Sequence, residues 1–190
     1  MKKLMKSIVL AATLLAAANS GNAQVATQKT VADLFKSLKV GQWLELQGTP
    51  QADMSYTAKK VKLLTGDFQD DDWEIKGVVK SVSATQKQFT VFRIPVTVTP
   101  DCVYESPDGT FTAFDNLKTG ILVECEGTYL KDGKFLAEEV QHETDFKPAE
   151  LNELLVVGKV EKIDPAKRTV TIMGSTFRIA GATKIQSVVK

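Results

Sequence analysis

The sequence predicts a mainly β protein built from small barrels, one contiguous and one assembled from the two ends of the chain. Two observations lead to this fold class. Within the 190 residues, two different segments each occur twice, in alternating order. Both segments carry apolar residues at every second position, which is the spacing of half-buried strands. Repetition and periodicity together therefore predict the architecture.

The first repeated segment, which we call half-repeat B, covers residues 34–61 and again residues 113–140. The two copies align at a constant offset of 79 without a gap, and 10 of 28 positions are identical. In the first copy the apolar residues at the start have helical spacing and predict a short helix with one apolar face: Val31, Leu34, Phe35 and Leu38.

Polar residues and glycines predict where the elements of half-repeat B begin and end. Thr30 with Asp33 forms an N-terminal capping pattern, and we expect Gly41 and its counterpart Gly120 to end the helix. A strand follows, and the turn at Asp132-Gly133 predicts a hairpin to a last strand. By alternation, the first of these strands points the following residues inward in the two copies: Leu44, Leu46, Val123 and Cys125.

The second repeated segment, half-repeat A, covers residues 77–104 and 158–185 at a constant offset of 81. Alternation predicts three strands in it, marked in the first copy by Val79 and Val82, by Phe89 and Val91, and by Val96 and Val98. The stretches 83–88 and 164–168 are turn-like connectors between the first two strands.

The order along the chain is B, A, B, A, so only residues 75–141 hold an A and a B in sequence. Three strands, a short helix and two strands is the order of the OB-fold, a five-stranded barrel, although an SH3-like barrel or a β-sandwich is an alternative. The N-terminal half-repeat (24–66) and the C-terminal half-repeat (154–190) each lack a neighbour, and residues 142–153 form a linker. Since open sheet edges are avoided, we expect these outer halves to pair with each other.

The first 23 residues have the basic, apolar and small-residue regions of a secretory signal peptide, with cleavage expected between Ala23 and Gln24. We therefore expect a periplasmic or secreted protein without a membrane span. Removing this segment takes away three lysines, which leaves 21 basic against 23 acidic residues, a net charge near −2. This charge does not favour binding to nucleic acid.

The repeat motif resembles a family of exported bacterial repeat proteins that is labelled only as a domain of unknown function. The match lies in G-x-V-x-x-V, F-x-x-L-K-x-G-x-x-x-E-x-x-G-T and D-G-x-F-x-A-x-x-V, and it covers residues 75–141. The residues that carry it are Gly77, Val79, Phe114, Leu117, Lys118, Gly120, Glu124, Gly127, Thr128, Asp132 and Gly133. The resemblance implies an OB-like fold and export, and it implies no catalytic residue. The chain is also loosely similar to periplasmic OB-fold stress-tolerance proteins.

The two cysteines, Cys102 and Cys125, both lie in the complete unit. Cys102 departs from the repeat pattern, because Thr183 stands opposite it in the second copy. An oxidising compartment permits a disulfide between them, whereas burial in the core would leave two free thiols. Both alternatives stay open, and a redox-active thiol pair is a third.

We name four ligand-binding candidates. Trp43 faces outward if Leu44 faces inward, and Phe92-Arg93 also departs from the inward pattern. We expect Phe92, Arg93 and Lys87 to lie near the strand 2–3 face of the complete unit, where OB barrels bind oligosaccharides or oligonucleotides. The alternative for the aromatic residues is packing between two barrels.

Other polar residues suggest no catalytic site. His142 is expected at the surface beyond the last strand. The acidic run Asp67, Asp70, Asp71, Asp72 and Glu74 lacks the alternating ligands of a calcium loop and is expected to be a solvated linker. We expect no metal site, no cofactor and no catalytic residue. The predicted function is a non-catalytic binding or scaffold module for an envelope glycan or protein. The alternatives are an envelope-homeostasis protein acting through protein contacts, and a hydrolytic enzyme.

Overall fold

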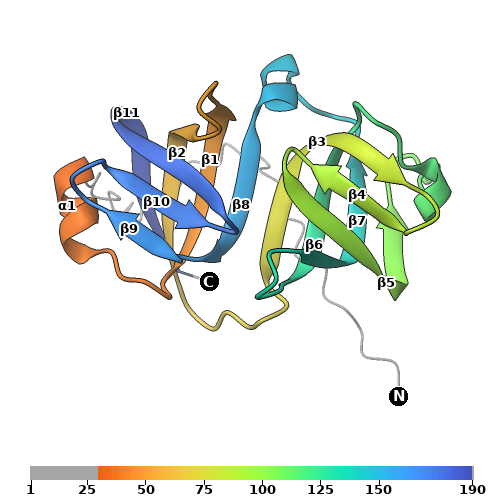
Figure 1. Cartoon of the computed structure of the whole chain (residues 1–190), viewed down its shortest axis with the longest axis horizontal. Helices are drawn as coiled ribbons and strands as arrows, with labels where there is room; N and C mark the ends of the chain where they lie inside the picture. Colours follow the sequence, from red (N-terminus) through yellow and green to blue (C-terminus); the bar gives the residue numbers. More distant parts are fainter. Residues whose placement is uncertain (1–29, 190) are drawn as a thin grey trace, which may run out of the picture.

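A computed structural model describes residues 30–189 of the chain, so the expected signal peptide lies outside the described residues. The described part is mainly β, with one short helix, α1 (Val31–Ser37), and eleven strands that form one hydrogen-bonded sheet. Figure 1 shows that the orange N-terminal strands and the blue C-terminal strands lie side by side, while the yellow-to-cyan middle of the chain forms the other half of the molecule.

The middle of the chain forms a closed, mixed, five-stranded barrel. Its strands are β3 (Trp73–Ser83), β4 (Gln88–Val91), β5 (Ile94–Glu105), β6 (Leu122–Tyr129) and β7 (Phe135–Glu143). They pair in the order β3-β4-β5-β7-β6 and back to β3, and only β5–β7 is parallel. The three strands predicted for half-repeat A and the two predicted for half-repeat B are therefore confirmed in this unit.

The remaining strands extend the sheet outside this barrel. They are β1 (Trp43–Pro50), β2 (Tyr56–Thr65), β8 (Leu154–Lys159), β9 (Lys162–Asp164), β10 (Thr169–Ile172) and β11 (Ser175–Val189). Strand β1 pairs with β8, and β2 runs parallel to β11. The N-terminal and C-terminal half-repeats thus bond to each other.

The strand registers of the outer half-repeats reproduce those of the central barrel. Ile179 pairs with Ala58 as Val98 pairs with Ala137, and in both places the register shifts before the next pairs. A β-bulge follows Gln47 in β1 and follows the equivalent Glu126 in β6. The sequence offsets of 79 and 81 are therefore also structural offsets.

The glycine after each bulge is required by the neighbouring backbone. A Cβ atom on Gly127 would lie 2.1 Å from the carbonyl oxygen of Leu136, and one on Gly48 would lie 2.6 Å from that of Thr57. Any side chain would push the paired strands apart, which explains why both copies carry glycine here.

Helix α1 begins as the sequence predicts. The side chain of Thr30 accepts a hydrogen bond from the Asp33 amide, and the Asp33 carboxylate accepts one from the Thr30 amide. The prediction that Gly41 ends the helix is wrong. The helix ends at Ser37, and Gly41, with φ +84°, forms the turn before β1 and donates to the carbonyl of Val160. The central copy has only a short 3-10 helix there, Phe114–Asn116.

The two halves of the molecule are joined by a pair of equivalent strands. The first part of β3 pairs with β8, and the central pair of this ladder is Ile75 with Val156. These two residues are related by the same offset of 81, each lying two residues before its copy of half-repeat A, so an approximate two-fold axis passes between them. Both side chains are fully buried. The core therefore continues from one half of the molecule to the other.

Candidate functional site

Trp43 does not face solvent. Its side chain is 9% exposed and lies in an aromatic cluster with Phe68, Trp73 and Tyr129. The ring of Trp43 is 5.2 Å from that of Phe68 and 5.1 Å from that of Trp73, which in turn is 5.6 Å from Tyr129. The expectation of an exposed Trp43 is wrong because the central unit covers the outer face of β1. Its position agrees with the alternative, packing between the units.

Phe92 and Arg93 also touch the outer half-repeats. They form the two-residue turn between β4 and β5, where the Phe92 ring packs edge-on against Tyr56 at 6.2 Å. The Arg93 guanidinium donates a 2.6 Å hydrogen bond to the carbonyl oxygen of Met54. Phe92 and Arg93 therefore bridge the central barrel to strand β2 and to the loop before it.

Lys87, the fourth candidate, lies at the helix end of the central barrel. Its ammonium group is 3.2 Å from the Asp115 carboxylate and 4.7 Å from the centre of the Phe114 ring. Lys87 thus already has an anionic partner and an aromatic one. Trp43 and the Phe92-Arg93 turn contact the other half of the molecule, whereas Lys87 contacts its own barrel. Their contacts give no sign of one common ligand face.

The cysteines are free thiols in this structure, and Cys125 is fully buried. Strand β7 lies between β5, which carries Cys102, and β6, which carries Cys125. A disulfide normally needs Cα atoms about 4.4–6.8 Å apart, roughly the spacing of adjacent strands. Because a whole strand separates the two cysteines, their positions do not favour a disulfide. Burial raises the pKa of Cys102 to about 11 and also raises the pKa of Cys125, so both thiols are protonated near neutral pH. This setting favours structural, unreactive thiols.

We expect two titratable thiols per chain in protein unfolded by guanidinium without reductant. In native buffer Cys125 will not react with a thiol reagent until the protein unfolds, because it is fully buried. A Cys102→Ser variant is the matched control and will lose one thiol. Finding no thiol in the unfolded, unreduced protein would show that the disulfide forms instead.

An acidic row crosses the outer face of the sheet. Glu139, Glu126 and Glu74 are directly paired neighbours on β7, β6 and β3. Burial raises the pKa of Glu74 to about 8, and the nearby carboxylates of Glu124, Glu45 and Glu126 add to this shift. The sequence prediction placed Glu74 in a solvated linker, and that placement is wrong, because Glu74 is the second residue of β3.

The raised pKa of Glu74 predicts that the free energy of unfolding falls as pH rises. The pKa of Glu74 is about 8 in the folded protein and 4.5 in an exposed carboxyl group, so the folded state holds an extra proton between these values. The stabilisation that comes from this proton on Glu74 is complete below pH 4.5 and is lost as pH rises through about 8. Glu74→Gln should raise the free energy of unfolding by about 1 kcal/mol at pH 9 and little at pH 4. Urea denaturation at both pH values tests this. Glu126→Gln, at the exposed member, is the control and should have a smaller effect.

The rest of the acidic run lies in the loop before β3. Asp70 pairs with Lys159 at 2.7 Å, and its carbonyl oxygen accepts a hydrogen bond from Thr128. Within residues 30–189 no group of His, Cys, Asp or Glu is arranged to hold a metal ion. His142 is not beyond the last strand as expected: it lies within β7, half-buried, with its ring 5.5 Å from Phe111.

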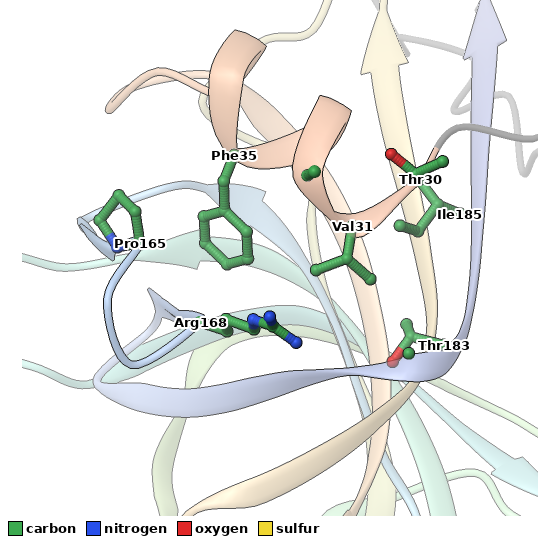
Figure 2. Close-up of a pocket in the computed structure, with 9 residues that line it drawn as sticks. Thr30, Val31, Phe35, Pro165, Arg168, Thr183 and Ile185 are labelled. Atoms are coloured by element: carbon green, nitrogen blue, oxygen red, sulfur yellow. The ribbon is translucent and has the colours of Figure 1, made fainter.

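A cavity lies beside α1, at a place that the sequence did not predict. It has a volume of about 660 Å³ and is open to solvent. Figure 2 shows Phe35 and Val31 pointing into it from the helix, with the Arg168 side chain extending across its floor. The other lining residues are Thr30, Ala32, Pro165, Gly181, Thr183 and Ile185. A signal was present in the sequence: at several of these positions the two repeat copies differ.

Within the described part of the chain, none of the helices is long and apolar enough to cross a membrane. Comparison with curated proteins gives no significant match, and comparison with solved structures gives none either. One family model matches, over residues 18–62 and 76–141. These ranges contain both copies of half-repeat B and the central half-repeat A. The chain therefore belongs to the family described as a domain of unknown function, DUF5666.

Proposed function

We propose that the chain is an exported, non-catalytic binding or scaffold module made of two OB-like barrels. The central unit has the OB strand order, with its short helix between the third and fourth strands. The second barrel would consist of β8–β11 followed by α1, β1 and β2, which is the same order in circularly permuted form. Its first strand would be β8 and β9 together, joined through Val160.

Hydrogen bonds around Val160 support closure of this second barrel. The Val160 amide donates to the carbonyl of Gln42 at 2.9 Å, as Val79 donates to Ile121 in the central barrel. The Val160 carbonyl accepts from Gly41, as that of Val79 accepts from Gly120. Val160 thus takes the place that Val79 has where β3 bends around the central barrel.

The observation that carries the functional proposal is that the residues shared by the copies have structural tasks. Phe114 and Leu117 are buried beside the barrel end, and Val61 and Val140 are buried in the last strands. The shared acids have structural contacts as well, since Glu45 and Glu124 pair with lysines on neighbouring strands. Asp53 and Asp132 each accept a hydrogen bond from the backbone amide two residues later. Selection for a common catalytic group would have left such a group among the shared residues.

A ligand screen tests the proposal. The mature chain, residues 24–190, would be titrated with envelope glycans, short nucleic acids and divalent cations while tryptophan fluorescence and melting temperature are followed. A saturable response to a glycan class is the expected result. Turnover of any of these compounds would contradict a non-catalytic role.

A second function, protein-protein contact in the envelope, is supported by the loop between β1 and β2. Met54 at its tip is 68% exposed and has φ +68°, and its carbonyl is held by Arg93. A fixed, exposed methionine suits an adaptable protein contact. A flat response across the ligand screen would favour this function.

Export is tested separately by expressing the chain in a bacterium and sequencing the N-terminus of the product. We expect the periplasmic or secreted product to begin at Gln24. A chain without residues 1–23 is the control and should stay in the cytoplasm. Export with residues 1–23 retained would contradict cleavage at this site.

A further inference from the structure

The cavity beside α1 differs from the equivalent place in the central unit, and this difference points to its ligand. In the central unit Lys87 pairs with Asp115 and lies against Phe114. The equivalent positions near the cavity are Arg168, Lys36 and Phe35. A lysine therefore stands where the central unit has the aspartate that neutralises its cation.

Arg168 is left with its charge uncompensated. The guanidinium is exposed and makes no ion pair with any described residue. Its backbone is nevertheless fixed: Arg168 has φ +54°, and its carbonyl accepts a 2.8 Å hydrogen bond from Ile179. Lys87 has the same conformation, with φ +49°. The turn thus fixes the backbone from which the Arg168 side chain reaches the cavity.

The large aromatic side chains of the central unit are also missing from the cavity. In the central unit, Tyr104 packs on the buried Phe111 at 5.9 Å between ring centres. The equivalent of Tyr104 is Ile185, which is smaller, and a volume of 660 Å³ beside it is open. Small-molecule sites have volumes of roughly 300–1,000 Å³ and are mainly apolar with a few polar groups.

The hydroxyl group of Thr183 does not add polarity to this site. It donates to the carbonyl of Ala58 at 2.8 Å and accepts from the Ala180 amide at 3.0 Å, so both functions are satisfied within the sheet. The cavity therefore offers apolar surface from Val31, Phe35 and Ile185, and one cation, Arg168, at its lining.

We propose that this cavity binds a small apolar anion, a carboxylate carried on a hydrocarbon chain or ring, with the anionic group on Arg168. A guanidinium binds a carboxylate through two parallel hydrogen bonds. Lys36 on the adjacent helix adds a positive charge at the position where the central unit has Asp115, the partner of Lys87. The proposal rests on the binding function proposed above and gives it a ligand class and a site.

Calorimetric titration with decanoate tests the proposal, and decylammonium serves as a probe of equal chain length and opposite charge. We expect decanoate to bind one site per chain at least tenfold more tightly than decylammonium. No binding of decanoate up to millimolar concentration, or equal binding of both probes, would overturn the proposal.

Four variants locate the site. Arg168→Gln should weaken decanoate binding by about tenfold or more, the loss expected for a charged hydrogen bond. Lys36→Asp should weaken it similarly, because it restores the ion pair of the central unit. Val31→Phe should block the apolar part of the cavity without changing any charge. Lys87→Gln is the matched control at the equivalent cation and should leave the affinity unchanged.

The controls keep this test separate from that of the proposed function. Arg168 and Lys87 are both exposed, so neither variant should change the melting temperature. Equal affinity of Arg168→Gln and the unchanged chain would overturn the site even if the chain binds a glycan elsewhere. Weakening by Lys87→Gln to the same extent as by Arg168→Gln would also overturn it.

Discussion

Replacing Gly158 by alanine will destabilise the protein by about 3 kcal/mol, the upper end of the usual cost of overpacking a core. A Cβ atom at this position would lie 2.3 Å from the indole ring of Trp73. That ring is 7% exposed and is held between Trp43 and Tyr129, so it has no space into which to move. The substitution would therefore separate the two halves of the molecule where β8 meets β3. Urea denaturation followed by tryptophan fluorescence measures the effect.

Two other glycines provide controls for Gly158. Gly181→Ala should change stability by less than about 0.5 kcal/mol, because a Cβ atom there would have nothing within 4 Å. Gly77→Ala should have an intermediate effect. Its Cβ would lie 2.8 Å from the ring of Phe92, which is only half-buried and can shift. If Gly158→Ala behaved like Gly181→Ala, the packing of Trp73 described here would be incorrect.

Ending the chain at Glu153 will unfold the N-terminal half-repeat while the central barrel persists. The truncation removes β8, the partner of one edge of β1, and β11, the parallel partner of β2. An isolated two-stranded hairpin with a short helix is at most marginally stable in water. Residues 30–66 should become sensitive to protease, whereas residues 73–143 should stay protected, as measured by mass spectrometry of the digest.

Trp43 reports the same event by fluorescence. It is 9% exposed in the full chain and should become exposed in the truncated one, which shifts its emission to longer wavelength. A Trp73→Phe background separates its signal from that of the second tryptophan. Unchanged emission, together with protease resistance of residues 30–66, would mean that the N-terminal half-repeat does not need the C-terminal one.

The elements and their inward-facing residues could be predicted because they depend on local pattern. Alternation placed Leu44, Leu46 and Cys125 in the interior, and all three are fully buried. Gapless repetition predicted that the copies share their registers, which the equivalent bulges after Gln47 and Glu126 confirm. A shift of one residue would have turned each strand's apolar face to solvent, so register is strongly constrained by sequence.

The surroundings of the proposed ligand residues could not be predicted in this way. Alternation tells which side of its own strand Trp43 lies on, but it does not tell what covers that side. Phe92 and Arg93 depart from the inward pattern because they contact Tyr56 and Met54 across the molecule. These contacts depend on the pairing of β3 with β8, the first strands of the two A copies. No pattern of charges or turns in the sequence predicts that these two strands pair.

The cavity was missed for a different reason. Repetition reveals what the two copies share, whereas the cavity arises where they differ. Lys36 in place of Asp115 and Ile185 in place of Tyr104 were both visible in the sequence. Their effect on shape and charge depends on the fold, which places these positions around one cavity.

The central claim is that the two ends of the chain form one barrel, and a disulfide between β2 and β11 tests it most directly. Lys62 and Gln186 are register partners in this parallel pair, although 124 residues separate them along the chain. In a chain with Cys102→Ser and Cys125→Ala, the pair Lys62→Cys and Gln186→Cys should oxidise readily and give a faster-migrating species on a non-reducing gel. Lys62→Cys with Glu138→Cys, on β7 of the central barrel, is the control and should not. Cross-linking of the first pair alone is the predicted result. Failure of that pair to cross-link, or equal cross-linking of both pairs, would contradict the account.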